Sequence, residues 1–399
     1  MKKIKLDNGI VLYLDPVRNA RTIGLCIVVN IGSIYEPKDK RGISHFLEHM
    51  LFKSNEKYSY KQIAESVELS GGCMNAITST MVTSYIFEVI PRSFKKIIDI
   101  AFHMFKNTKF VESEFESEKK VVLSEIERDL NDPEARLWDT SMQAAYGSSD
   151  YGDPIQGFRE TVESIEKNEL EEFKAKFYTP DNMHIILSGN FSKRHVEDVK
   201  KVFCKLEGAC ARKKKPRHGK GKNIVMKMHT ENQIYYSLNF PVHCDLHIIE
   251  AFENFVCGGM SSLLFQIFRE KYGIGYELFF GCNTLYPNER ALISLMVPGF
   301  EKERKSLLKH ALCELFETLQ KENLEKYYEG RKRMLKLDYE KTRKDIFERL
   351  EESYKIVMLY NESFDEFMKK VFQIKLEEII DFALSLKKKR GKEVWILPK

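Results

Sequence analysis

Short runs of β-branched and apolar residues, separated by polar turns, mark the strands of the first 200 residues. Residues 9–14 and 22–29 are rich in valine, isoleucine and leucine, and a polar turn separates them. The same pattern predicts a strand over 74–90 and a short buried strand over 184–189. We therefore expect a sheet to be established early in the chain.

Helical patterns lie between these strands. Ser44 is the expected N-cap of a helix that continues to Phe52, because no breaker interrupts this stretch. Residues 94–105 and 112–130 also have helical spacing, and Pro133 follows the second of them. Strands mixed with helices in this order predict an α+β unit that ends near residue 205.

The pattern restarts after a basic stretch. Residues 208–222 contain proline and glycine with almost no large apolar side chain, which favours a surface linker over the alternative of a nucleic-acid patch. We thus divide the chain into domains 1–207 and 223–399. The second domain is expected to hold a strand pair (224–228 and 233–240), a helix from about 247, strands within 276–298 and helices within 302–359. This order resembles the first half and suggests an internal duplication, with residues 42–49 laid on 259–266.

Composition agrees with a folded chain of two or three domains. The 399 residues carry 64 Lys and Arg against 59 Asp and Glu, and 43% are hydrophobic, which excludes disordered and collagen-like proteins. Interleaved charges argue against nucleic acid as a partner. Eight cysteines without a C-x-x-C pair indicate reduced thiols. Because no apolar run is long enough for a signal peptide or a membrane span, we expect a cytoplasmic protein that does not enter a membrane.

One helix carries a pattern typical of zinc chemistry. His45 and His49 are four residues apart, so their imidazoles lie on one helix face, and Glu48 stands beside the second. Two imidazoles suit a zinc ion, and Glu48 is placed to take a proton from water at the metal. Residues 45–49 thus read H-x-x-E-H, the inverse of the H-E-x-x-H motif of zinc proteases. The alternative is a pair of surface histidines on an amphipathic helix.

A third ligand is expected among the carboxylates of the helix 112–130. Glu118 and Glu125 are seven residues apart and share one face of that helix. Other glutamates surround them, so an ordinary charged helix face is the alternative that the spacing leaves open.

Together these residues resemble the pitrilysin-type zinc peptidases (M16), the family of insulin-degrading enzyme and mitochondrial processing peptidase. The similarity to the family runs through most of the chain, and the motifs that carry it include Gly71, Gly72, Asn75, Ala76, Glu118, Glu125, Tyr178, Pro180, Asn182, Arg269, Gly275 and Tyr276. The length matches the short branch, which is similar to bacterial processing-peptidase-like proteins. The resemblance implies an α+β fold of two homologous domains, each a largely antiparallel sheet with helices packed on one face, in a clamshell dimer.

The resemblance also assigns roles to the zinc residues. His45, His49 and Glu125 match the three ligands of one Zn²⁺ per chain. Glu48 matches the general base, and Glu118 matches a carboxylate that holds the ligand set from outside.

Two further pairs are matched in the same way. Asn75 and Ala76 match an edge strand whose backbone pairs with the peptide substrate, as the strand predicted there allows. Arg269 and Tyr276 match a pair that supports the oxyanion of the scissile carbonyl. Because this pair lies in the second domain, we expect it to act in trans, from the partner subunit of a homodimer.

The resemblance thus implies a zinc metalloendopeptidase that cleaves unfolded or short peptides inside a closed chamber. Three alternatives remain: the catalytic half of a heterodimeric processing peptidase with an inactive homologue, a non-catalytic structural subunit of the same family, and a zinc-storage or sensing protein.

Overall fold

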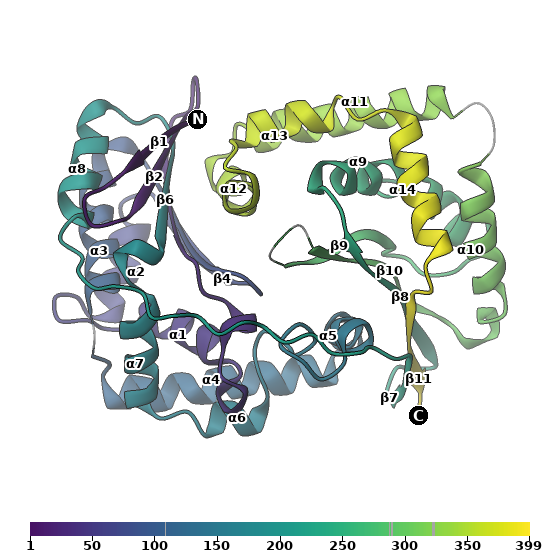
Figure 1. Ribbon diagram of the computed structural model, residues 1–399, viewed down its shortest axis with the longest axis horizontal. Coiled ribbons are helices and arrows are strands. Elements are labelled where there is room, and N and C mark those ends of the chain that lie inside the picture. The colour runs from purple at the N-terminus through teal and green to yellow at the C-terminus, as the bar shows by residue number, and fades with distance from the viewer. Residues whose placement is uncertain (108, 287, 289, 321–323) are drawn as a thin grey trace. The chain divides into compact units, whose positions relative to one another are not determined.

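The computed structural model describes residues 1–107, 109–286, 288, 290–320 and 324–399, which form two compact units (Figure 1). The first unit contains residues 1–126, 154–216 and 340–364, and the second contains 127–153, 217–339 and 365–399. Each unit is therefore assembled from separate stretches of chain. The division at 208–222 that the sequence suggests stays a prediction, although those residues form neither helix nor strand.

The first unit is built on a six-stranded mixed sheet with the order β1-β2-β6-β3-β5-β4. Only the β2–β6 pair of this sheet is parallel. The residues 74–90 form a hairpin of two strands and not one, because the chain turns at 79–82. The strands are β1 (Lys2–Lys5), β2 (Val11–Pro16), β3 (Ile23–Val29), β4 (Cys73–Thr78), β5 (Thr83–Val89) and β6 (Met183–Gly189).

The second unit is built on a five-stranded mixed sheet with the order β7-β11-β8-β10-β9, in which only β7 and β11 run parallel. The expected pairing of 224–228 with 233–240 is wrong, because the C-terminal strand β11 lies between them. The strands are β7 (Ile224–Met228), β8 (Gln233–His243), β9 (Phe279–Tyr286), β10 (Arg290–Glu301) and β11 (Lys392–Pro398).

The two sheets repeat one topology. Strands β2-β6-β3-β5-β4 and β7-β11-β8-β10-β9 have the same order, the same sequence succession and the same single parallel pair. This supports the internal duplication. The residue match that suggested it is out of register, however, because the first helix after β3 is α1 (Ile43–Leu51) and the first after β8 is α9 (Leu246–Val256), not 259–266.

Helices cover both faces of the first sheet, and the expectation of helices on one face is wrong. Figure 1 shows α12 on one side of this sheet and α3 and α8 on the other. Every residue of β3 is buried, as a strand covered on both faces requires. The helices are α1, α2 (Tyr60–Glu68), α3 (Phe94–Lys106), α4 (Glu112–Asn131), α6 (Arg159–Glu163), α7 (Lys167–Phe177), α8 (Lys193–Phe203) and α12 (Ile346–Tyr360).

Helix α12 comes from the far end of the chain, and a buried ion pair holds it on this sheet. Arg349 donates to both carboxylate oxygens of Asp15 on β2, at 2.8 and 3.0 Å, and both side chains are buried. Ser188 donates to the same carboxylate at 3.1 Å. The helix lies so close to β3 that a Cβ on Gly24 would stand 2.4 Å from Leu350. Glycine is thus the residue that allows this packing.

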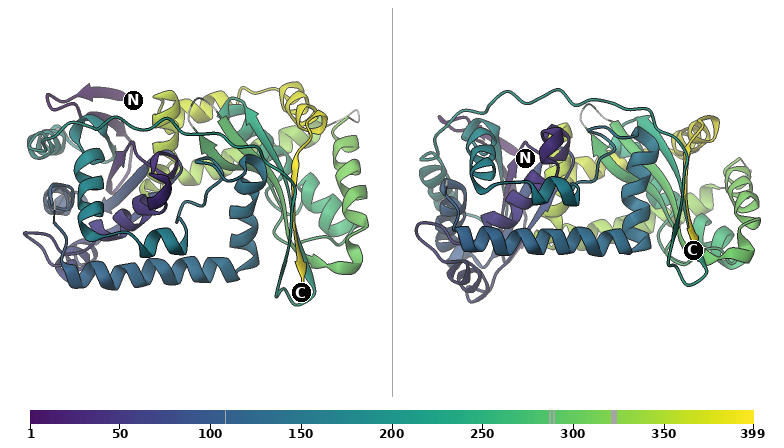
Figure 2. Two further views of the ribbon diagram at one scale, coloured as in Figure 1. Left: turned by 60° about the horizontal axis from the view of Figure 1, so that its bottom comes forward. Right: turned by 90° about the horizontal axis from the view of Figure 1, so that it is seen from below.

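Helix α5, from the first half of the sequence, covers one face of the second sheet, as α12 from the second half covers one face of the first. Its Leu137 and Ala144 pack against Val394 and Ile396 of β11, and α10 and α14 lie on the other face (Figures 1 and 2). None of the described helices combines the length and the apolar character needed to cross a membrane. The helices are α5 (Pro133–Tyr146), α9, α10 (Leu307–Thr318), α11 (Glu325–Thr342), α13 (Phe364–Val371) and α14 (Leu376–Lys388).

The start of α1 differs from the expectation that Ser44 caps it. The N-cap is Gly42, at φ +92°, and its backbone N–H donates to the carboxylate of Glu36 at 2.8 Å. The N–H of Ser44 donates to the other oxygen of the same carboxylate, also at 2.8 Å. A buried glutamate from the preceding turn therefore satisfies the orphan donors of this helix, a contact that local sequence patterns do not reveal.

Breaking the ion pair of α12 should destabilise the first unit. We expect Asp15→Asn to lower the free energy of unfolding by about 3–5 kcal/mol, because it leaves the Arg349 guanidinium buried without its counter-ion. Denaturant unfolding measures this. The exposed Arg343–Glu340 pair provides a control, in which Glu340→Gln should cost under about 1 kcal/mol. Equal losses in the two variants would contradict the role given to the buried pair.

The capping carboxylate should make stability depend on pH. Burial raises the pKa of Glu36 from 4.5 to about 7, although the N–H donors of Gly42 and Ser44 oppose the shift. The folded state therefore binds a proton more tightly than the unfolded chain, and this stabilisation is present below pH 4.5 and lost as the pH rises to about 7. The unfolding free energy of wild type minus that of Glu36→Gln should fall over this interval.

Urea titrations at several pH values measure this difference. A wild-type advantage over Glu36→Gln that stays constant or grows between pH 4.5 and 7 would show that the buried carboxyl does not titrate as described.

Candidate metal centre

Helix α1 places two imidazoles side by side. His45 and His49 are one turn apart, with ring centroids 4.7 Å from each other and ring planes at 73°. The opposite face of the helix is apolar, and Phe46, Leu47 and Met50 are buried in the core of the first unit. Burial of that face leaves the two histidines at the edge of the core, partly open to solvent, with side-chain exposures of 15% and 18%.

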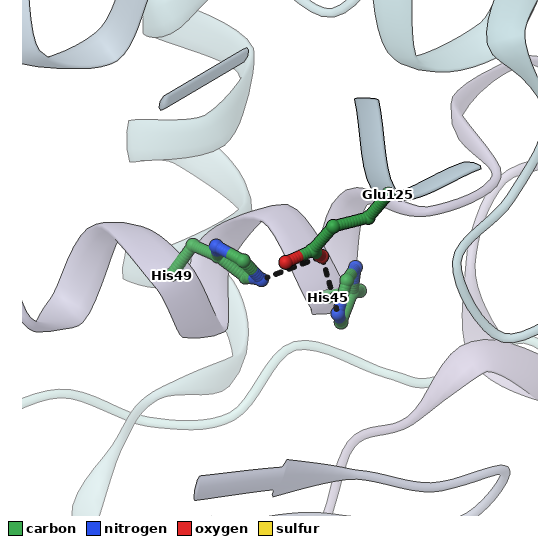
Figure 3. Close-up of side chains that lie close together, drawn as sticks. All are labelled: His45, His49 and Glu125. Atoms are coloured by element: carbon green, nitrogen blue, oxygen red, sulfur yellow. Dashed lines mark ion pairs between the residues drawn. The ribbon is translucent and has the colours of Figure 1, made fainter. Parts of the chain in front are cut away.

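A carboxylate from α4 meets both rings. One oxygen of Glu125 lies 3.4 Å from Nε2 of His49 and 4.0 Å from Nε2 of His45 (Figure 3). The structure thus brings together the three residues that the sequence nominated as ligands, with donor atoms within 4.8 Å of one another. Zinc binds nitrogen and oxygen at about 2.0–2.2 Å, so ligand atoms around one tetrahedral ion stand about 3–4 Å apart. The three residues fit one zinc ion and leave its fourth corner open.

Glu118 orients His49 from behind. Its Oε1 lies 2.9 Å from Nδ1 of His49, so the ring donates there and turns Nε2 toward Glu125. The other oxygen of Glu118 contacts the ammonium group of Lys53. Burial would raise the pKa of Glu118, but the hydrogen bonds from His49 and Lys53 outweigh it and hold that pKa below its usual range. Glu118 is therefore a carboxylate that stays ionised.

The surroundings of the rings are electrically negative. Burial alone would lower the pKa of His49, but the hydrogen bond to Glu118 and the charges of Glu125 and Glu48 raise it. A site that favours a cation on an imidazole by this means also favours a divalent cation between the imidazoles.

Glu48 points from α1 toward the hairpin β4–β5. The hydroxyl of Thr78, the last residue of β4, donates to Oε2 of Glu48. Burial raises the pKa of Glu48, with the nearby charge of Glu125 adding to it, against the effects of Thr78 and His49. The carboxylate is thus a better proton acceptor than an exposed glutamate, as a general base requires.

Asn75 and Ala76 lie on β4, at the end of the described sheet. Their backbone pairs with Ile86 and Tyr85 of β5 on one side, and the strand order places no described strand on the other. The open edge and the Glu48 contact therefore belong to the same short strand, because Thr78 follows Ala76 by two residues.

Arg269 and Tyr276 come together in the second unit. The guanidinium carbon of Arg269 lies 3.9 Å from the ring centroid of Tyr276 and 4.6 Å from that of Phe265. Tyr276 is 66% exposed, so the cation–π contact lies at the surface. Arg269 and Tyr276 thus lie in contact with each other, as the resemblance to the family leads us to expect. Their role in catalysis stays a prediction.

Two residues of the centre escaped the sequence reasoning. Lys53 follows His49 by four residues, and that spacing could have placed it beside the histidines. Thr78 cannot be found this way, because the sequence predicts one strand over 74–90 and not the hairpin that aims the Thr78 hydroxyl at Glu48.

Comparison with known proteins agrees with this geometry. The family described as Insulinase (Peptidase family M16) matches residues 11–157, and the Peptidase M16 inactive domain matches residues 164–330. The chain is 33% identical over 285 residues to the uncharacterized zinc protease YmxG of Bacillus subtilis (strain 168), covering 70% of this chain and 69% of that protein.

Two further likenesses point the same way. A probable mitochondrial-processing peptidase subunit beta of Arabidopsis thaliana is 29% identical over 202 residues, which is 50% of this chain and 38% of that protein. The crystal structure of a protease from Helicobacter pylori matches all of this chain and 99% of its own with a TM-score of 0.90, at 20% identity, and so shows the fold alone. On the family matches and the identity to a bacterial zinc protease, the chain belongs to peptidase family M16, as a two-domain protein similar to bacterial zinc proteases and to mitochondrial processing peptidase.

Proposed function

We propose that this protein is a zinc-dependent metalloendopeptidase that cleaves unfolded or short peptides. The observation that carries the proposal is the convergence of His45, His49 and Glu125 within ligand distance, with the carboxylate of Glu48 on the same helix face. Zinc-storage and purely structural roles require neither the raised proton affinity of Glu48 nor an open strand edge next to it.

One zinc ion per chain would be held by Nε2 of His45, Nε2 of His49 and a carboxylate oxygen of Glu125. When bound, zinc supplies Lewis-acid chemistry, in which it acidifies water and polarises a carbonyl. The chain supplies the orientation of the ligands, since Glu118 accepts a hydrogen bond from Nδ1–H of His49 and Lys53 contacts the other oxygen of Glu118.

Glu48 moves the proton. Thr78 occupies its Oε2, so we assign Oε1 as the atom that accepts a proton from the attacking water. The same carboxyl then delivers this proton to the nitrogen of the departing amine, which completes the cleavage of the peptide bond into acid and amine. Burial of Glu48 favours this by holding its pKa above the usual range of a carboxyl.

The substrate would bind as an added strand on β4. Backbone groups at Asn75 and Ala76 would pair with the peptide's own amides, which requires an extended chain and reads little of its sequence. Folded proteins present few such segments, so unfolded or short peptides are the expected class. A closed chamber formed by a clamshell dimer would enforce the same selection.

The quaternary structure proposed is a homodimer, with a heterodimer containing an inactive homologue as the alternative. In the homodimer, Arg269 and Tyr276 would support the oxyanion from the partner subunit. The compartment proposed is the cytoplasm, supported by eight cysteines that are all free thiols. Neither nucleic acid nor a membrane is proposed as a partner.

Replacing the proposed base should separate metal binding from turnover. Glu48→Gln keeps the size of the side chain but cannot accept the proton, so we expect it to retain one zinc per chain and to lose at least about 100-fold in kcat. Zinc content by mass spectrometry and cleavage of an unfolded peptide mixture measure the two properties. The chelator-treated wild type should be equally inactive and should recover with zinc; full activity of zinc-verified Glu48→Gln would remove the base from the mechanism.

Lys53 should act as a positioning residue for the ligand set. We expect Lys53→Gln to weaken zinc binding by about 10–100-fold, because Glu118 loses the partner that orients it behind His49. Competition with a chromogenic chelator measures the affinity. Lys53→Arg should restore most of it, and Lys61→Gln, at an exposed position on α2, should have no effect. Unchanged zinc affinity in Lys53→Gln would refute the positioning role.

A mixed dimer tests whether the Arg269–Tyr276 pair acts in trans. One subunit carries Glu48→Gln, and the other carries Arg269→Ala with Tyr276→Phe. If the pair serves the partner's centre, the mixed dimer keeps one complete site and about half of the wild-type activity, whereas each mutant homodimer is inactive. An inactive mixed dimer would place the pair in cis. The mass of the purified protein by light scattering establishes first that it is a homodimer.

A further inference from the structure

One cavity of the protein lies apart from the residues of both the metal centre and the strand edge of β4. It lies in the second unit and measures about 770 Å³, within the range of small-molecule sites. Its walls come from β8, β11 and the start of α10. Because Val394 and Ile396 pack toward α5 and residues alternate along a strand, Trp395 faces the other side of the sheet, where the cavity is.

The floor of the cavity is aromatic and apolar. The rings of Tyr236 and Trp395 lie 4.5 Å apart between centroids, at 56° to each other. Tyr236 and Leu308 are buried, with exposures of 1% and 3%, and Leu312 completes this surface. Such a floor suits a flat ring, which buries apolar area without needing hydrogen bonds.

The rim of the cavity is basic. Lys302, Lys305 and Lys309 line it, and none of the three forms an ion pair with a carboxylate of the described residues. Lys305 instead places its ammonium group 4.7 Å from the ring centroid of Trp395. These side chains are exposed, so their mutual repulsion is screened by solvent.

The acidic residues of the cavity do not cancel this charge. Glu393 and Glu303 also line it, which leaves an excess of one positive charge. The carboxylate of Glu393 already accepts a hydrogen bond from Nε1 of Trp395 at 2.9 Å. Helix α10, twelve residues long, starts at this wall with an N-cap, Ser306, whose side chain accepts no capping hydrogen bond, so the positive end of its dipole adds to the lysines.

We propose that this cavity binds a small organic anion that carries an aromatic ring. The ring would lie on the partly exposed Trp395, which packs against the buried Tyr236, and the anionic group, a phosphate, sulfonate or carboxylate, would sit among Lys302, Lys305 and Lys309. An anion without a ring would miss the floor, and a ring without an anion would leave the lysines uncompensated. The site is independent of the zinc chemistry, so it holds even for a chain that cleaves no peptide.

Tryptophan fluorescence allows a direct test, because the sequence has two tryptophans, Trp138 and Trp395. In full-length Trp138→Phe, the remaining emission comes from the floor of the cavity. We expect 8-anilinonaphthalene-1-sulfonate, an aromatic sulfonate, to quench Trp395 saturably at one site per chain. Phenyl phosphate should displace it, while inorganic phosphate and phenol at the same concentration should displace at least 10-fold less.

Charge variants then tie the binding to the rim. Lys305→Gln with Lys309→Gln, in the same background, should weaken binding of the sulfonate at least 10-fold, and Lys369→Gln, at an exposed position on α13 that does not line the cavity, should leave it unchanged. Circular dichroism verifies that the variants are folded. Absence of saturable quenching, equal affinity in the double variant, or displacement by inorganic phosphate as strong as that by phenyl phosphate would each overturn the proposal.

Discussion

The burial of one face of α1 is the constraint on which the rest of the centre depends. Phe46, Leu47 and Met50 anchor this helix in the core, and its first N–H groups are satisfied by the buried carboxylate of Glu36. With one face and one end held, the opposite face can only point outward at the edge of the core. His45 and Glu48 are thereby presented in fixed directions, which a helix free to rotate could not do.

Three carboxylates lie on or beside this helix, and only one of them has a lysine of the described residues as its partner. Glu118 is neutralised in part by Lys53, but Glu125 and Glu48 face the imidazoles without a cation of their own among the described residues. Such an arrangement costs stability when empty and is relieved by a divalent ion. The proton affinity of Glu48 is raised chiefly by the burial of its carboxyl, and the nearby charge of Glu125 adds to this effect.

The duplicated topology extends to the helices that cover the two sheets. Each sheet is covered on its second face by a helix from the other half of the sequence, α12 on the first sheet and α5 on the second. The fully buried run of β3 could have signalled a strand covered on both faces, but it could not have named the covering helix. Asp15 and Arg349 are separated by 334 residues, and no local pattern links them.

Local periodicity was therefore enough to predict most helices and strands, the two imidazoles on one helix face, and the shared helix face of Glu118 and Glu125, because these follow from spacing along one element. The resemblance to the family assigned Glu125 as the third ligand and Glu118 as the carboxylate that supports the ligands, and spacing alone left both roles open. Only the tertiary structure decided that Glu36 caps α1, that Thr78 contacts Glu48, and that β11 separates β7 from β8. Each of these depends on which surfaces meet across long stretches of chain, and sequence patterns encode the face that is buried but not the partner that buries it.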